Sequence, residues 1–107
     1  MSIFSIGAEK WPGISKLVEE AGEVLQICGK LLGTNGESKH WNVPNLNVAL
    51  EDELADLMAA ILFVIVECGL DASRITLRCA EKVARFSRWQ EEHEECEKRR
   101  LAGDPTP

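Results

Sequence analysis

Acidic residues gather in two short stretches of the sequence, at a spacing that places side chains on one face of a helix. Glu20 and Glu23 lie in the stretch KLVEEAGEVLQ, and Glu53 and Asp56 lie in the stretch EDELADL. Residues three apart are neighbours on a helix surface, so the members of each pair can act together. Four carboxylates brought close together repel one another, and a hard divalent cation that prefers oxygen ligands, Mg²⁺ or Mn²⁺, removes that repulsion. The two pairs therefore predict a metal site; the alternative is that both stretches are solvated helix faces.

The first pair is expected on a long helix from Ile14 to Leu32. Pro12 and Gly13 precede this segment and Gly33 follows it, as is typical of helix starts and stops. Spacings of three and four predict one apolar stripe on this helix, with both carboxylates on its flank. The residues of that stripe are Ile14, Leu17, Val18, Ala21, Leu25, Cys28 and Leu32.

The second pair is expected on a helix that starts near Asn45 or Asn47, either of which can cap it, and that ends at Gly69. Glu53 and Asp56 flank its apolar stripe. The residues of that stripe are Leu54, Leu57, Ile61 and Ile65. Packing the two helices through their stripes would bring both carboxylate pairs face to face at the border of the core.

A third helix is expected to begin after Asp71 or Ser73 and to run at least to Trp89, with a charged extension over residues 90–107. The whole chain, residues 1–107, is thus predicted to be a single all-α domain, a small bundle of three long helices with a short N-terminal segment. The segment from Leu57 to Val66 is apolar on every side, and three helices cannot easily cover it. We therefore expect oligomerisation to complete the bundle. The alternative is a monomer whose N-terminal residues fold over the gap.

Composition and charge argue against several classes of protein. Eighteen acidic residues against twelve basic ones give a net charge of −6, the opposite of what a surface for DNA or RNA polymers needs. The longest apolar run is about half as long as a membrane span, so no membrane association is expected. No signal-peptide pattern opens the chain, and the four cysteines form no C-x-x-C pair. Reduced thiols and a cytoplasmic location are therefore expected.

The stretch EEAGE followed by ELAD resembles the E-E-x-x-E and E-x-x-D signature of the MazG-like, all-α nucleotide pyrophosphohydrolases. The resemblance covers roughly residues 10 to 90. It implies Mg²⁺-dependent hydrolysis of (deoxy)nucleoside triphosphates to the monophosphate and pyrophosphate, for sanitation of the nucleotide pool, by a homodimer or homotetramer. Carried over by position, it makes the metal ligands Glu20, Glu23, Glu53 and Asp56. Glu19, the first acid of the signature, would be a catalytic base or would position water, unless it is simply exposed to solvent.

A triphosphate also needs cationic partners, and two of the expected helices carry basic residues. Lys16 and Lys30 fall on nearly the same helical stripe as Glu23, since steps of seven residues almost superpose. In the MazG-like family the third helix commonly carries a Lys followed by an Asn and by basic residues that reach the phosphates. Lys82 fits this pattern, whereas the Asn is absent. The candidate contacts on this helix are Lys82, Arg85 and Arg88, and the alternative is an exposed basic face.

Recognition of a base would need a flat side chain. Trp11, just before the first helix, or Trp41, in the Gly- and Asn-rich loop of residues 33–47, could stack on a nucleobase, although such residues also cover core edges. The loop is long enough to suggest a lid. A redox di-metal bundle would use Glu-x-x-His on helices, and the chain has that spacing only from Glu37 to His40, within the loop. A non-catalytic helical interaction module with solvated acidic faces is the alternative to an enzyme.

Overall fold

The computed structural model describes residues 11–34 and 45–103 of the chain. These residues form three helices and no strand, which confirms the predicted all-α class. The helices are α1 (Ile14–Gly33), α2 (Leu46–Glu67) and α3 (Ala72–Leu101). The predicted loop lid and Trp41 lie outside the described residues.

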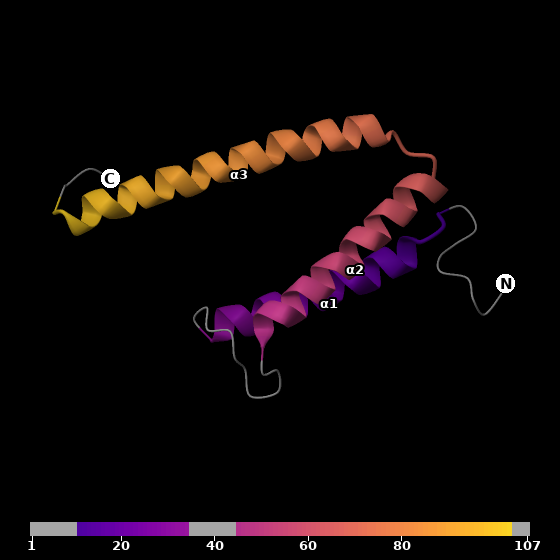
Figure 1. Cartoon of the computed structure of the whole chain (residues 1–107), viewed down its shortest axis with the longest axis horizontal. Coiled ribbons are helices and arrows are strands. Elements are labelled where there is room, and N and C mark those ends of the chain that lie inside the picture. Colours follow the sequence, from indigo (N-terminus) through magenta and orange to yellow (C-terminus); the bar gives the residue numbers. More distant parts are fainter. Residues whose placement is uncertain (1–10, 35–44, 104–107) are drawn as a thin grey trace. The chain divides into compact units, whose positions relative to one another are not determined.

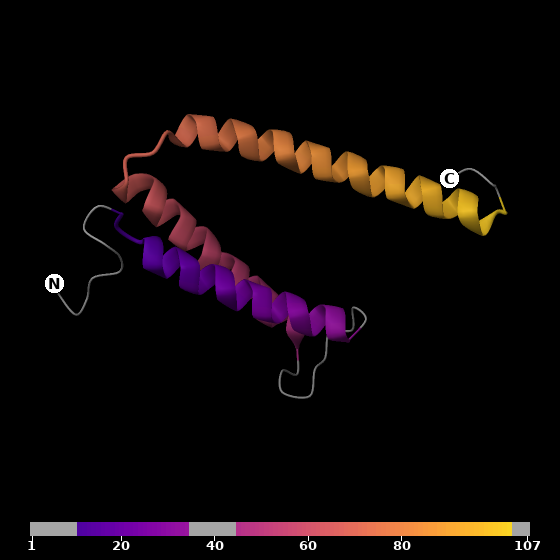
Figure 2. The same cartoon turned by 180° about the vertical axis from the view of Figure 1, so that it is seen from behind.

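Two compact units make up the chain, Met1–Leu70 and Asp71–Pro107, and each is described by itself. That the whole chain is one domain stays a prediction. In the first unit, α1 and α2 lie side by side and run in opposite directions (Figure 1). Figure 2 shows the same helical hairpin from behind. The antiparallel arrangement places the EEAGE stretch of α1 beside the ELAD stretch of α2.

Both ends of α2 are closed by residues that the sequence singles out. Asn45 caps the start, where its Oδ1 accepts a hydrogen bond from the backbone N–H of Val48 at 3.1 Å. At the other end Gly69 adopts a φ of 62°, and the N–H groups of Gly69 and Leu70 donate to carbonyls of the last turn. This is a Schellman motif, which glycine permits because it has no Cβ. The predicted boundaries of α2 are therefore confirmed.

The start of α1 is fitted closely against α2. Gly13 adopts a φ of 85°, and a Cβ at this position would lie 2.5 Å from Cδ1 of Phe63 and 3.2 Å from Cγ2 of Val64. The Sγ of Cys68 donates a hydrogen bond to the carbonyl of Pro12 at 3.5 Å. Both the left-handed backbone and the close approach require glycine here. The Pro-Gly pair predicted to start the helix thus also fixes its position on the last turns of α2.

The hairpin packs through faces that differ from the predicted stripes. Its buried residues are Glu20 and Ile27 on α1 and Leu46, Ala60 and Val64 on α2. By contrast Val18, Leu25 and Leu32 on the predicted stripe of α1 are largely exposed.

On α2, Leu54 and Ile61 of the predicted stripe are also exposed. The chain carries more apolar surface than one partner helix can cover, so periodicity identifies the helices without deciding which face meets which neighbour. The prediction that the carboxylates lie at the border of the packed face is therefore wrong for Glu20, which is inside it.

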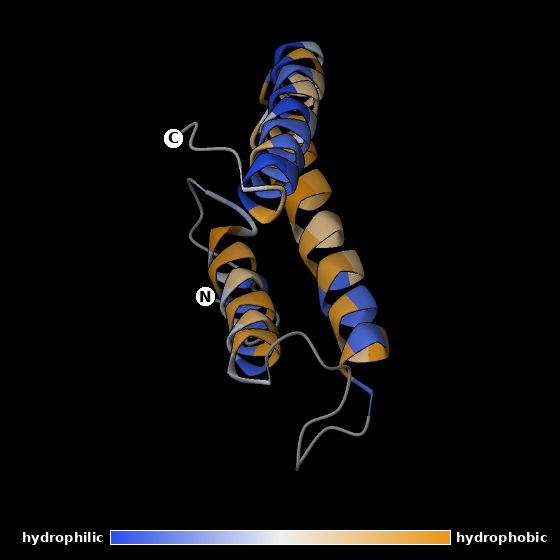
Figure 3. Cartoon of the chain, turned by 90° about the vertical axis from the view of Figure 1, so that its left-hand side faces the viewer, coloured by the Kyte–Doolittle hydropathy of each residue, from blue (hydrophilic) through white to orange (hydrophobic). Residues whose placement is uncertain are grey.

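A second apolar stripe runs along α2. Met58, Leu62 and Val66, spaced four residues apart, are each more than half exposed. Figure 3 shows that α2 changes from partly hydrophilic at its start to hydrophobic over its later turns. An exposed stripe of this kind needs a cover. The oligomer expected from the sequence stays a prediction.

The second unit consists largely of α3. The Oδ1 of Asp71 caps this helix by accepting a hydrogen bond from the N–H of Arg74 at 3.0 Å, which confirms Asp71 as the start. The helix continues to Leu101, so the charged extension is helical over most of its length. An ion pair of 2.8 Å between Glu97 and Arg100 supports its last turns. Among the described helices, none combines the length and the apolarity needed to cross a membrane.

Candidate metal centre

Four carboxylates lie together between α1 and α2, and they belong to Glu20, Glu23, Glu53 and Asp56. Each residue offers one oxygen, and these four oxygens lie within 4.8 Å of one another. Opposite ligands of one octahedral Mg²⁺ are separated by about 4.2 Å, so small side-chain adjustments would bring all four oxygens to one ion. The structure therefore brings together all four residues that the sequence singled out as metal ligands.

Two carboxylate oxygens in this cluster are buried without a partner. Glu20 is only 7% exposed, and its Oε2, like Oε2 of Glu53, is a buried atom with no hydrogen-bond partner. A desolvated carboxylate oxygen without a donor is unfavourable by itself, and a cation would satisfy it. The donor set is oxygen only, which suits Mg²⁺ or Mn²⁺. The residues present thus fit a hard divalent cation.

Crowding of the acids raises the pKa of Glu23. The hydrogen-bonding proximity of Glu53, and then the negative charge of that carboxylate, raise the pKa of Glu23 above its ordinary value. A proton between the two carboxylates relieves the same repulsion that a divalent cation would relieve. A proton and a divalent cation would therefore compete for this part of the cluster.

Glu19 lies outside the cluster and is paired with a lysine. Its Oε1 is 3.2 Å from Nζ of Lys16, and Oε1 of Glu20 is also 3.2 Å from the same Nζ. The hydrogen bond to Glu19, followed by that to Glu20, raises the pKa of Lys16, so the ammonium stays charged. The catalytic role of Glu19 stays a prediction, since its half-exposed carboxylate is paired with Lys16 and is not among the four clustered carboxylates.

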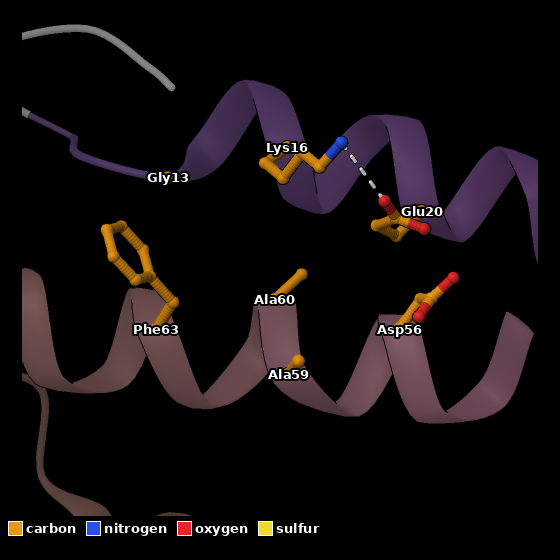
Figure 4. Close-up of a pocket in the computed structure, with 7 residues that line it drawn as sticks. All are labelled: Gly13, Lys16, Glu20, Asp56, Ala59, Ala60 and Phe63. Atoms are coloured by element: carbon orange, nitrogen blue, oxygen red, sulfur yellow. Dashed lines mark ion pairs between the residues drawn. The ribbon is translucent and has the colours of Figure 1, made fainter. Parts of the chain in front are cut away.

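A hollow of about 280 Å³ adjoins the cluster. Figure 4 shows Lys16 and Glu20 on α1 facing Ala60 and Asp56 on α2, with Phe63 at the other end. The hollow has a charged end, next to the carboxylates, and an apolar end. Its lining residues are Gly13, Lys16, Glu20, Asp56, Ala59, Ala60 and Phe63.

The hollow contains residues that the sequence did not identify as functional. The sequence assigned Gly13 and Ala60 only to a helix start and an apolar run. Both are small and line the hollow, Gly13 at the Phe63 end and Ala60 between Phe63 and Asp56. Phe63 offers an aromatic face in the place where Trp11 or Trp41 was expected to supply one. The small residues Gly13 and Ala60 were the only sequence signal for the hollow, and they indicate it only when the alignment of the two helices is known.

The remaining predicted contacts lie away from the cluster or in the other unit. Trp11 is about half exposed immediately before α1, and Lys30 lies in the last turn of that helix. The three predicted contacts of the third helix lie on α3, in the second unit: Lys82, Arg85 and Arg88. The Nζ of Lys82 lies 5.9 Å from the centre of the Phe86 ring, a cation–π distance. Phosphate contacts by these residues stay predictions.

Comparisons with protein-family models, with curated proteins and with solved structures give no significant match. The case for a function therefore depends on the site itself.

Proposed function

We propose that this chain is a Mg²⁺-dependent nucleoside triphosphate pyrophosphohydrolase of the MazG-like type, which releases pyrophosphate from (deoxy)nucleoside triphosphates. One observation carries the proposal: four carboxylates from two helices offer oxygens within 4.8 Å of one another, two of them with buried, unpartnered oxygens. A cluster of this composition is unfavourable without a cation. The adjoining hollow, with an aromatic ring at its far end, supports a ligand that has both a charged and an apolar part.

The roles of the chain's own residues follow from their positions. Glu20, Glu23, Glu53 and Asp56 would hold the cation, and a bound Mg²⁺ would neutralise charge on phosphate oxygens and lower the pKa of a bound water. Lys16, which lines the hollow, would add a positive charge there. The apolar end of the hollow, at Phe63, would contact the apolar part of such a ligand.

The proposal includes an assembly and a location. The exposed stripe of Met58, Leu62 and Val66 supports a homodimer or homotetramer in which these residues are covered. Removal of unwanted nucleotides would place the protein in the cytoplasm, where the nucleotide pool is.

Pyrophosphate release from a panel of nucleoside triphosphates tests the proposal. Purified protein is expected to release pyrophosphate with Mg²⁺ or Mn²⁺ and to lose that activity in excess chelator. Monophosphate and pyrophosphate should appear in equal amounts, since the α–β phosphoanhydride is the bond cleaved. No turnover of any triphosphate with either metal would contradict the proposal and would favour the non-catalytic interaction module.

A further inference from the structure

Lys16 forms an ion pair with Glu20, one of the four candidate metal ligands. Its Nζ lies 3.2 Å from Oε1 of Glu20 and 3.2 Å from Oε1 of Glu19 (Figure 4). The other oxygen of Glu20, Oε2, is buried and has no partner. One carboxylate therefore faces an ammonium on one side and the acidic cluster on the other.

We propose that Lys16 is a built-in counter-cation of the carboxylate cluster, which competes with the divalent cation for Glu20 and is released toward an anionic ligand when that cation binds. The proposal rests on the proposed function only in its choice of cation and phosphate. It assigns to Lys16 a coupling between two binding events, beyond a simple contact to substrate.

Competition follows from charge and geometry. In the metal-free chain the ammonium offsets part of the negative charge of Glu20, which is almost fully buried. A divalent cation among the four carboxylates takes over that role and repels the ammonium. The lysine stem is flexible and its side chain is 44% exposed, so the ammonium can move without disturbing the packed face. Glu19, at the same distance, retains Lys16 near the site after Glu20 is withdrawn.

The hollow determines what the released ammonium meets. Lys16 is the one cationic residue among the seven that line it, and the others offer carboxylates, small apolar groups or the Phe63 ring. An anionic group bound in the hollow beside the cluster would therefore have Lys16 as its positive partner among these seven residues. Phosphate fits best, because its oxygens can face the ammonium on one side and the metal on the other.

Thermodynamic linkage makes the coupling between cation binding and phosphate binding reciprocal. If cation binding frees Lys16 for phosphate, phosphate binding must strengthen cation binding by the same factor. Removal of Lys16 should then act in opposite directions on the two ligands. The cation alone should bind more tightly, and phosphate in the presence of the cation should bind more weakly.

Titration calorimetry with Mn²⁺ alone provides the first test, on the full chain freed of metal. Lys16→Met keeps the length and apolar character of the stem and removes the charge. We expect it to bind Mn²⁺ roughly two- to fivefold more tightly than the parent, within the range for loss of a partly exposed ion pair. Lys30→Met is the matched control, since it removes the same charge from the same helix about 10 Å beyond Glu23 along the axis. It should leave the affinity for Mn²⁺ within about twofold of the parent at physiological salt.

Inorganic triphosphate, titrated into protein saturated with Mn²⁺, provides the second test. Lys16→Met should bind it several-fold more weakly than the parent, and Lys16→Arg should retain most of the affinity because it keeps the charge. Equal Mn²⁺ affinities for Lys16→Met and Lys30→Met, or unchanged triphosphate affinity in Lys16→Met, would overturn the proposal. A parent that binds no Mn²⁺ overturns it together with the metal centre. If Lys16→Met binds Mn²⁺ more tightly and triphosphate more weakly, but the parent has no turnover, the role of Lys16 is supported and the proposed activity is contradicted.

Discussion

Glu20 of α1 and Asp56 of α2 face each other across the helical hairpin, at the charged end of the hollow that reaches Phe63. The two residues are far apart in the sequence, and the antiparallel course of the helices brings them together. Glu20 occupies the packed face itself, where an apolar side chain would stabilise a simple hairpin. A buried acid in that place fits the proposal that this face holds a cation as well as packing the two helices.

The first prediction concerns pH and Glu23, in the metal-free protein. Glu53 raises the pKa of Glu23, so the folded chain holds this proton more tightly than the unfolded chain does. The resulting stabilisation is fully present below the ordinary pKa of 4.5 and is lost as the pH rises through the raised pKa. Chemical denaturation in chelator should therefore show the parent losing stability relative to Glu23→Gln as the pH rises from about 4 to 7.

Subtracting the variant from the parent removes the contribution of all other titrating groups that the substitution leaves unchanged. With saturating Mn²⁺ the trend should reverse, because the cation binds the deprotonated carboxylates. A parent-minus-variant difference that is constant with pH would show that Glu23 and Glu53 are not coupled in solution.

The second prediction concerns the close fit of α1 on α2. Gly13→Ala should destabilise the protein by at least about 1–2 kcal/mol, the usual unfavourable energy of a left-handed backbone for a residue with a Cβ. The contact with Phe63 should increase this destabilisation, since the new Cβ would lie 2.5 Å from Cδ1 of the ring. Thermal or urea unfolding measures the change.

Gly29→Ala is the matched control for this substitution. Gly29 lies within α1, and a Cβ there would meet nothing within 4 Å. Its replacement should stabilise the helix by up to about 1 kcal/mol, because alanine is the better helix former. The free energy of unfolding is expected to fall in Gly13→Ala and to rise in Gly29→Ala. Similar small changes in both variants would mean that Gly13 is not held against Phe63.

Much of this fold could be predicted from the sequence, because its signals are local. Asn45, Asp71 and Gly69 fix helix ends through hydrogen bonds within a few residues, and the two acidic pairs follow from helical spacing. The packing face could not be predicted. The apolar Val18 is exposed while the acidic Glu20 is buried, and which face packs depends on what covers the remaining apolar surface. The hollow was missed for a related reason, since it exists only when small residues of the two helices face each other.

The third prediction concerns the exposed stripe on α2. Light scattering at micromolar concentration should give at least twice the chain mass of 11.9 kDa. Leu62→Lys, in the middle of the stripe, should shift the protein toward the monomer, because a charge would have to be buried in the interface. Leu101→Lys, at an exposed apolar residue near the end of α3, should leave the assembly unchanged. A parent that is monomeric would contradict the oligomer and would require another cover for this stripe.

The fourth prediction concerns Glu53→Gln. This change keeps the shape of the side chain and removes one charge from the crowded cluster, so the metal-free variant should be no less stable than the parent. Mg²⁺ or Mn²⁺ should stabilise the parent by about 2.7 kcal/mol at a hundred times the dissociation constant, and the variant much less. Turnover should fall by orders of magnitude.

Glu51→Gln removes the same charge from an exposed position on the same helix and is the control for Glu53→Gln. It should retain the parent's metal-dependent shift in melting temperature and its turnover, because Glu51 lies outside the cluster. Melting curves with and without metal, measured beside pyrophosphate release, separate the two cases. If Glu53→Gln behaves like Glu51→Gln in both measurements, Glu53 is an ordinary helix residue and the four-carboxylate site is not a metal centre. If it loses the metal-dependent shift while the parent has no turnover, the site binds metal for a purpose other than hydrolysis.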